Sequence, residues 1–366
     1  MNRQLIYCIL LFAILQSCEQ IYTPDIDETG GAIVVDARIV SGSTGNYVIL
    51  YKSIGYNDES RIYPPVTGAS VSIISDAGEE QKLTEYTPGR FPADVRLNSE
   101  NQYKLKILYE GNVYESSFEP VPTIPSIDTV YGEGGTKLIA PEGSNNVDDF
   151  FETVGVQLYS DILDKDELPY FRFTARLVLQ YVYTVMVPSQ VGPPVEVPTF
   201  AWTSSYPSDT YNIAAPDRFT SSGNILRHPL YFLVKTPYLG KESFMVNGPY
   251  FDGWILIINQ HRLSKPAFDF YDDLNKQLEA NGKMFDPMYI QARNNLKCIN
   301  NPDAVVLGNF EISTVSEARY FVIFMSEKEG YLVKKIPYFY EIPLSGESLG
   351  SQPDFWEKAY KEYPKE

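Results

Sequence analysis

The residues with the clearest chemistry stand at the start of the chain. Leu15-Gln16-Ser17-Cys18 matches the bacterial lipobox, in which a small residue precedes the cysteine that becomes the first residue after cleavage. The thiol of that cysteine accepts a diacylglyceryl group, and the freed amine is then acylated as well. Each buried methylene adds about 0.8 kcal/mol to membrane binding, so two or three chains anchor a protein firmly. We therefore predict lipidation at Cys18, with an ordinary signal peptide and a chance cysteine as the alternative.

The residues before Cys18 have the pattern of a secretory signal. Arg3 precedes an apolar run from Leu5 to Leu15. About 20 apolar residues are needed to span a bilayer, so this run is too short for an anchor helix. We predict a signal peptide over residues 1–17 and a lipidated, acidic tether over residues 18–30. The acidic residues of the tether are either a sorting signal towards the outer membrane or a solvated linker.

One segment formally matches the nucleophile-elbow pattern of hydrolases, Gly346-Glu-Ser-Leu-Gly350. A true elbow is a strand-to-helix turn whose catalytic histidine comes later in the chain. Both histidines, His228 and His261, come earlier, and the flanks of the segment resemble a terminal loop. We therefore predict no catalytic residues and no enzymatic activity, and we interpret both histidines as structural or surface residues.

A metal or cofactor site is not expected either. Asp161, Asp164, Asp166 and Glu167 crowd one turn, and a loop of carboxylates can supply several of the six to eight oxygens that calcium takes. The run lacks the spacing and central glycine of an EF-hand, so Asp161–Glu167 is more typical of a solvated acidic turn. Two histidines and three cysteines argue against an all-protein zinc or haem site.

Aromatic side chains offer the best candidate for a binding surface. The segment between Val187 and Arg218 contains six prolines, which predict a loop region. Tyr and Trp act as anchors at protein interfaces, and exposed rings also stack on sugars. We favour an interaction surface here over plain packing in a β protein. Its candidate residues are Phe200, Trp202, Tyr206 and Tyr211.

Composition limits the partners and the architecture. The 366 residues contain 47 acidic and 30 basic side chains, a net charge of −17, which disfavours nucleic-acid binding. A hydrophobic fraction of 44% excludes wholesale disorder, and the length suits two domains. Cleavage and acylation would leave Cys298 as a lone thiol, so no intramolecular disulfide is expected.

The first part of the chain predicts an immunoglobulin-like or transthyretin-like β-sandwich over residues 31–119. Apolar residues alternate with polar ones, as in Tyr103–Tyr109, and short strands are separated by turn signals. Gly111-Asn112 predicts a two-residue hairpin turn, because glycine readily adopts positive φ. The proline-rich residues 120–125 predict a linker between two domains.

Residues 126–366 predict a second β domain with a small helical insertion at about 265–297. Ser264 is a candidate cap for a first helix that stops near Gly282, and Asp286-Pro287 predicts the start of a second. The apolar face of the first helix is predicted from residues at helical spacing, Ala267, Tyr271, Leu274 and Leu278. The predicted strands, rich in Val, Ile, Tyr and Phe, are Thr153–Tyr159, Tyr170–Val187, Leu230–Val234, Gly253–Asn259, Val305–Ser313 and Tyr320–Ser326. Tyr170–Val187 is long enough to be bent or bulged. The expected fold is mainly β, with two sandwich-like domains.

These motifs, in this order, resemble the lipoprotein family catalogued as domain of unknown function 4249. The matching features cover essentially the whole mature chain. They are Leu15–Cys18, Gly68-Ala-Ser-Val-Ser-Ile, the 103–116 hairpin, Phe285-Asp-Pro, Cys298-Ile-Asn-Asn-Pro-Asp-Ala-Val-Val-Leu-Gly-Asn-Phe and Gln352-Pro-Asp-Phe-Trp. Members often carry further cysteines before the final motif, and this chain has none, so a disulfide clamp is not expected there.

The resemblance implies an outer-membrane lipoprotein, since such proteins are commonly encoded beside TonB-dependent receptors with a carboxypeptidase-regulatory-like N-terminal domain. It supplies no catalytic residue, and Cys18 is the one functional position that transfers. We expect a non-enzymatic, lipid-anchored protein at the cell surface, with the periplasmic face as the alternative location. It would help a TonB-dependent receptor to take up a nutrient. The alternative is a structural or adhesive accessory of an envelope complex without a small-molecule ligand.

Overall fold

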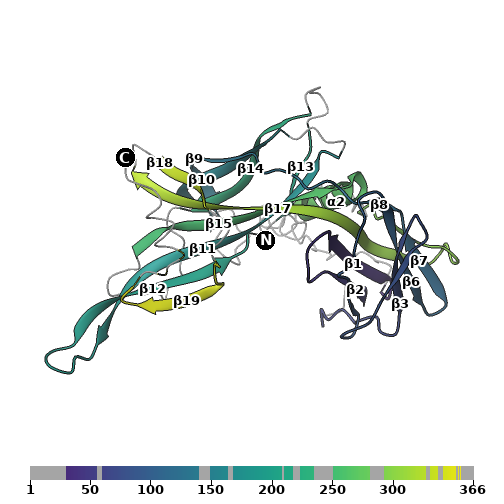
Figure 1. Cartoon of the computed structure of the whole chain (residues 1–366), viewed down its shortest axis with the longest axis horizontal. Helices are drawn as coiled ribbons and strands as arrows, with labels where there is room; N and C mark the ends of the chain where they lie inside the picture. The colour runs from purple at the N-terminus through teal and green to yellow at the C-terminus, as the bar shows by residue number, and fades with distance from the viewer. Residues whose placement is uncertain are drawn as a thin grey trace, which may run out of the picture.

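The chain folds into twisted β-sheets, and one long strand of the largest sheet extends through both halves of the molecule (Figure 1). The computed structural model describes residues 30–55, 60–139, 149–163, 168–207, 210–216, 223–234, 250–280, 292–326, 330–336, 341–351, 353 and 355. Within these residues nearly all regular structure is strand, with one helix, so the predicted mainly-β class with a small helical insertion is confirmed.

The largest sheet in the described residues has ten strands. Eight follow one another in the order β19-β12-β11-β15-β17-β1-β2-β5, while β13 pairs with β11 and β18 pairs with β17. The bounds are β1 (Ile33–Val40), β2 (Tyr47–Lys52), β5 (Arg90–Pro92), β11 (Tyr170–Val187), β12 (Val195–Ser205), β13 (Asn212–Ala214), β15 (Tyr250–Leu263), β17 (Val306–Ser326), β18 (Gly330–Ile336) and β19 (Ser345–Leu349).

Two smaller sheets pack against the large one. A three-stranded sheet has the order β14-β10-β9, and a six-stranded sheet has the order β16-β7-β6-β3-β4, with β8 paired to β6. Their bounds are β3 (Ser70–Ser75), β4 (Glu80–Leu83), β6 (Gln102–Tyr109), β7 (Asn112–Ser116), β8 (Glu119–Pro120), β9 (Thr129–Ile139), β10 (Phe151–Ile162), β14 (Ile225–Val234) and β16 (Leu296–Cys298).

Strand β17 connects the two halves of the molecule (Figure 1). Its first half pairs in parallel with β1, from Ile33 opposite Val306 to Val40 opposite Ser313. Its second half pairs with β15 and β18. The sequence predicted two separate strands here, and this was wrong. Residues 314–319 between them continue the strand, because β15 pairs with Thr314–Val322 and so bridges the two predicted strands.

The first sandwich draws its core from both parts of the sequence. Buried residues of β1, β2 and β5 face β3, β6 and β7, and the same cluster contains Leu296, Cys298, Phe310 and Ile312. Residues 31–119 therefore do not supply this core alone. The division into two domains at residues 120–125 stays a prediction, and β8 occupies the start of that segment.

The second sandwich lies between β9, β10 and β14 and the large sheet. Its core contains alternate residues of β11, from Phe171 to Leu179, packed against Trp254, Leu256 and Tyr320. Strand β11 has the predicted bounds, and its pairing with β15 shifts register between Gln180 and Tyr181, so the predicted irregularity is confirmed.

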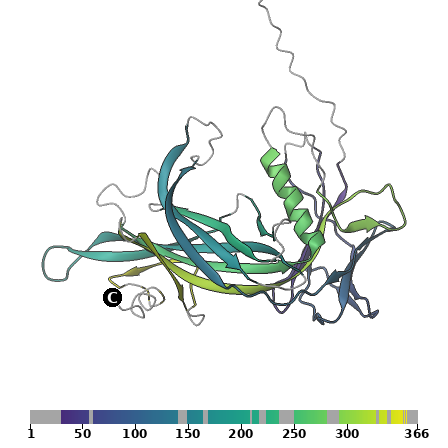
Figure 2. The ribbon, with the colours of Figure 1, turned by 90° about the horizontal axis from the view of Figure 1, so that it is seen from above.

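Helix α2 (Lys265–Ala280) follows β15 directly and lies beside the region where β17 pairs with β1 (Figure 2). Ser264 caps it as predicted, because its hydroxyl accepts a hydrogen bond from the amide of Ala267 at 3.3 Å. Residues 281–291, which contain Gly282 and most of the second predicted helix, lie outside the described residues. At the end of the predicted insertion, Leu296–Cys298 forms β16 against β7.

Two further predictions are corrected. The hairpin turn after β6 consists of Glu110 and Gly111, with φ of 49° and 81°, one residue earlier than Gly111-Asn112. Positive φ at both central residues is what this two-residue turn requires.

The proline-rich segment contains β12 and β13 and is not a continuous loop. Pro198 fits within β12 because the β19 ladder covers Thr199–Thr203, so no bond of that ladder needs a proline amide.

Candidate functional site

The four predicted aromatic residues do not form one surface. Phe200 and Trp202 lie on β12 and are half-buried, and the Trp202 ring packs edge-on against Phe355 at 5.3 Å between centroids. Tyr206 is exposed beyond the end of that strand. Tyr211 lies beside helix α2, where its ring is 4.8 Å from that of Tyr271. Tyr211 is the member that belongs to a cavity.

The other predicted motifs have structural environments. Gly346–Gly350 overlaps β19, which is an edge strand and not a strand-to-helix turn. A Cβ on Gly346 would lie 2.4 Å from the Trp202 ring. His228 stacks on Phe173, and burial lowers its pKa to about 4. The pKa of His261 is lowered to about 3 by burial and by the charge of Arg172.

Some predicted sites cannot be placed. Cys18, the signal peptide and the tether up to residue 29 lie outside the described residues, as do residues 164–167 of the acidic turn. Asp161 is described, and its carboxylate accepts a hydrogen bond from the Arg227 amide at 2.7 Å.

The described part of the chain has no group of three or more His, Cys, Asp or Glu side chains that could hold a metal ion. It also has no helix of the length and apolarity needed to span a membrane.

A cavity of about 450 Å³ lies between helix α2 and strands β1, β2 and β17, and we call it the α2 cleft. Alternation along β1 explains one side of it. Ile33, Val35 and Ala37 point into the first sandwich, whereas Asp36 and Arg38 point to the opposite face and line the cleft. Asn309 is the register partner of Asp36 on β17, so its side chain lies on the same face.

Four aromatic rings line the α2 cleft: Tyr51, Tyr211, Phe270 and Tyr271. Tyr51 comes from β2, and the other rings come from α2 or are held by it. The Asn275 side chain fixes Tyr211 in place, since it accepts from the Tyr211 amide at 2.9 Å and donates to the Tyr211 carbonyl at 2.7 Å. The helix therefore presents two of its own rings and positions a third.

A buried ion pair contacts Tyr271, one of the residues that line the α2 cleft. The Arg172 guanidinium donates to the carboxylate of Glu311 at 3.0 Å, and the Tyr271 hydroxyl donates to the other carboxylate oxygen at 2.6 Å. Burial raises the pKa of Glu311, but the charge of Arg172 and the Tyr271 hydrogen bond outweigh it, so the pKa is lowered overall. Burial and the negative charge of Glu311 raise the pKa of Tyr271 well above its ordinary value. At neutral pH the cluster therefore holds one cation, one anion and a neutral phenol.

A second ion pair lies at the rim of the α2 cleft. The Arg38 guanidinium donates from Nε and Nη2 to the two carboxylate oxygens of Asp36, both at 2.9 Å. Such a bidentate pair fixes the orientation of both side chains. The charged groups described here are thus paired with one another, and the cleft carries little net charge.

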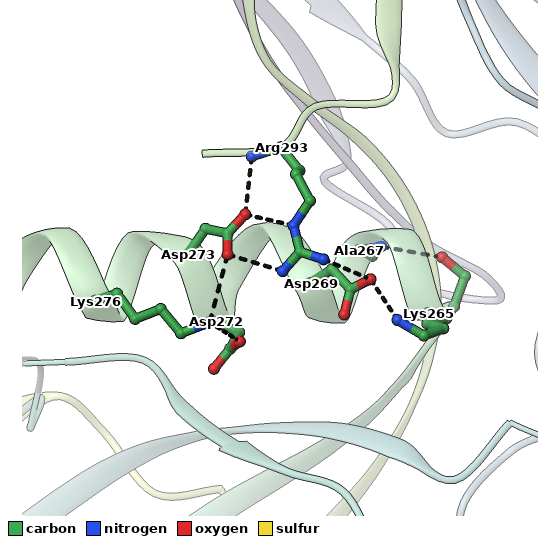
Figure 3. A network of polar contacts seen from close by, with 8 residues as sticks. Lys265, Ala267, Asp269, Asp272, Asp273, Lys276 and Arg293 are labelled. Carbon is green, nitrogen blue, oxygen red and sulfur yellow. Dashed lines mark hydrogen bonds and ion pairs between the residues drawn. The ribbon is translucent and has the colours of Figure 1, made fainter. Parts of the chain in front are cut away.

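Arg293 fastens helix α2 to the sheet (Figure 3). Its Nε donates to Asp273 Oδ2 at 2.6 Å and its Nη2 donates to Asp273 Oδ1 at 2.8 Å. These bonds hold the pKa of Asp273 at about 2. The next residues reach β17, since the Asn294 side chain donates to the Val306 carbonyl at 2.7 Å. Arg293 therefore links helix α2, on one side of the α2 cleft, to the segment that is hydrogen-bonded to β17 on the other side.

We expect Asp273→Asn to lower the free energy of unfolding by about 1 kcal/mol at pH 7, because the partner Arg293 is more than half exposed. The folded pKa of Asp273 lies below its ordinary value of 3.8, so this contribution is present above pH 3.8 and is lost as pH falls through about 2. Urea titrations at pH 7, 4 and 2.5 should show the difference between wild type and variant shrinking with acidification. A constant difference would contradict this assignment.

Sequence reasoning missed most of this site. Asp36, Arg38, Asn309 and Glu311 lie inside strands, where they are polar positions between apolar ones and look like an ordinary solvent-exposed face. Tyr271 was predicted as part of the apolar face of the helix. The available signal was the run of polar residues Asn309, Glu311 and Ser313 in a strand that is otherwise strongly apolar.

Comparison with known proteins identifies the family of this chain. No curated protein matches it, and no solved structure matches it. The family model described as domain of unknown function (DUF4249) matches residues 19–319, a span that includes the described residues of the α2 cleft. The chain belongs to the DUF4249 family.

Proposed function

We propose that this protein is a non-enzymatic lipoprotein of the outer membrane. It is anchored through an acylated Cys18, displayed at the cell surface, and delivers a small ligand to a TonB-dependent receptor. The observation that carries the binding role is the α2 cleft, a concave site that combines four aromatic rings with a few fixed polar groups. Its volume of about 450 Å³ lies in the range of ligand pockets, roughly 300–1,000 Å³. The lipobox and the family resemblance support the anchor and the receptor.

The paired charges of the α2 cleft favour binding over catalysis. A general acid or base must exchange a proton with a substrate near neutral pH. Glu311 is fully buried and already accepts bonds from Arg172 and Tyr271, and its pKa is lowered. Tyr271 titrates far above neutral pH. These groups hold fixed protonation states, as suits a rigid binding site.

A second candidate function, an accessory of an envelope complex, is favoured by the β11–β12 hairpin. The hairpin extends away from the body of the molecule (Figure 1). Exposed apolar side chains lie around its tip, including Val191 at 93% exposure, Met186 at 59% and Val195 at 54%. Such a tip suits insertion into a partner protein.

Affinity purification from detergent-solubilised membranes of the native host separates the two functions. Recovery of a TonB-dependent barrel at near-unit stoichiometry supports the uptake role. Recovery of secretion or assembly components in place of the barrel would overturn it. A Val191→Asp variant tests whether the hairpin tip makes the contact, since a buried charge there would abolish co-purification and leave the α2 cleft intact.

We expect Cys18→Ala to abolish metabolic labelling with a fatty acid and to move the protein from the membrane fraction to the soluble fraction. The reason is that the thiol is the only group of the lipobox that can accept the diacylglyceryl group. Cys298→Ala is the matched control, because Cys298 is buried in the first sandwich and should leave labelling unchanged. Unchanged membrane fractionation of Cys18→Ala would refute the anchor.

A further inference from the structure

Asn309, on the floor of the α2 cleft, has a side chain with unused hydrogen-bonding capacity. It is 6% exposed, it lines the cavity, and neither its amide nitrogen nor its amide oxygen has a hydrogen-bond partner among the described residues. Burying a carboxamide without partners costs stability, and an apolar side chain at the same position would avoid that cost. A ligand that presents a donor and an acceptor side by side would satisfy both atoms.

The rings of the cleft indicate the shape of that ligand. Tyr211 and Tyr271 are tilted by 49° with centroids 4.8 Å apart, and Phe270 lies 5.5 Å from Tyr271. Aromatic faces carry negative electrostatic potential and attract the weakly positive C–H groups of an aliphatic ring. A pyranose offers such a C–H face, and its vicinal hydroxyls offer the adjacent donor and acceptor that Asn309 needs.

The charges of the cleft favour a neutral ligand. Arg38, which lines the cleft, is engaged by Asp36, and Arg172, which lies against the Tyr271 ring, is engaged by Glu311. An anionic ligand would have to compete with a carboxylate for either guanidinium. The net charge of −17 adds a further penalty against anions.

The position of the cleft disfavours an extended peptide. Main-chain recognition of a peptide commonly adds a strand to an exposed sheet edge. The floor of the α2 cleft is the face of the sheet, and β1 is hydrogen-bonded on both sides, by β17 and by β2. The cleft therefore offers side chains but no free edge.

We propose that the α2 cleft binds a neutral saccharide, with vicinal hydroxyls of one ring bonded to the Asn309 carboxamide and the C–H face of that ring against Tyr211. This assignment rests on the proposed function, since it names the class of ligand that the lipoprotein captures. Tyr51, Phe270 and Tyr271 enclose the remainder of the sugar.

The test is calorimetric titration of the mature, detergent-solubilised protein with D-glucose, D-galactose, D-mannose, N-acetylglucosamine, maltose and cellobiose. Glucose 6-phosphate and triglycine serve as anionic and peptide comparisons. We expect 1:1 binding of at least one neutral sugar. Asn309→Leu should weaken that binding about tenfold or more, the effect of losing one to two hydrogen bonds, while the melting temperature stays equal or rises. Tyr211→Ala should also weaken it.

Two matched variants serve as controls. Thr199→Val removes a buried hydroxyl on β12, away from the cleft, that has no hydrogen-bond partner in the described part of the chain, and Tyr86→Ala removes an exposed ring elsewhere. Both should bind the sugar as the wild type does. The proposal is overturned if no neutral sugar binds, if triglycine or the phosphate ester binds better, or if Asn309→Leu retains wild-type affinity. Receptor co-purification without sugar binding would leave the proposed function standing, whereas sugar binding without a receptor would overturn the receptor role alone.

Discussion

Arg172→Met is expected to lower the free energy of unfolding by about 3–5 kcal/mol, the usual cost of leaving one member of a buried ion pair without its partner. Glu311 is fully buried and Arg172 nearly so, with Nη2 and Oε1 3.0 Å apart. The substitution removes the positive charge that lowers the pKa of Glu311. Urea and thermal unfolding of the wild type and the variant measure the loss.

The pH dependence of this variant should reverse. In the wild type the pKa of Glu311 is lowered, so its contribution is present above pH 4.5 and is lost as pH falls through the folded pKa. In Arg172→Met burial is no longer opposed by the guanidinium, so the folded pKa rises above 4.5. The variant should then lose stability as pH rises through that value, and its deficit should be larger at pH 8 than at pH 5.

Two controls make this prediction specific. The double variant Arg172→Met with Glu311→Gln removes both charges of the pair and keeps an acceptor for the Tyr271 hydroxyl, so it should recover more than half of the loss. Lys276→Met breaks an exposed pair with Asp272 on α2 and should cost about 0.5 kcal/mol or less. A loss below about 1 kcal/mol for Arg172→Met would contradict the structural importance of the pair.

Gly308→Ala is expected to cost about 4 kcal/mol or more and to separate β1 from β17. Gly308 has φ of +94°, and a Cβ there would lie 1.9 Å from the carbonyl oxygen of Val35, its register partner. The left-handed backbone costs roughly 1–3 kcal/mol for a residue with a side chain. The clash adds to this, because the strands must part and give up ladder hydrogen bonds.

Gly42→Ala separates the two causes. Gly42 has φ of +78°, and a Cβ there would have no atom within 4 Å. Its substitution should therefore cost only the backbone strain, about 1–2 kcal/mol. Denaturant unfolding gives both costs, and hydrogen exchange should show loss of protection in β1 for Gly308→Ala alone. Equal effects of the two substitutions would disprove the close approach.

Local signals in the sequence predicted the elements well. The limits of β11 were predicted because Tyr170–Val187 is a run of β-branched and aromatic residues, and α2 was predicted from its apolar spacing and its Ser264 cap. Strand β12 was missed because its prolines are strong local breakers, whereas pairing with β11 decides the structure. Lipidation at Cys18 stays a prediction, because a modifying enzyme recognises the lipobox and the fold of the described residues does not test this recognition.

The candidate site was hidden for a different reason. It requires Asp36 and Asn309 to become neighbours, and they are brought together by a parallel ladder between β1 and β17. Nothing local in either strand indicates its partner. Tyr211 was identified from its aromatic character, but its companions Phe200 and Trp202 belong to another part of the sheet.

The parallel pairing of β1 with β17 also constrains how the chain acquires its fold during synthesis. Residues 31–119 leave the ribosome early, yet their core includes Phe310 and Ile312. At roughly 5–20 residues per second, β17 follows some 10–40 s after residue 119. During that interval the apolar side chains of β1 and β6 lack the residues of β17 that pack against them in the folded protein. We therefore expect the nascent first sandwich to require a holding chaperone until the last fifth of the chain is made.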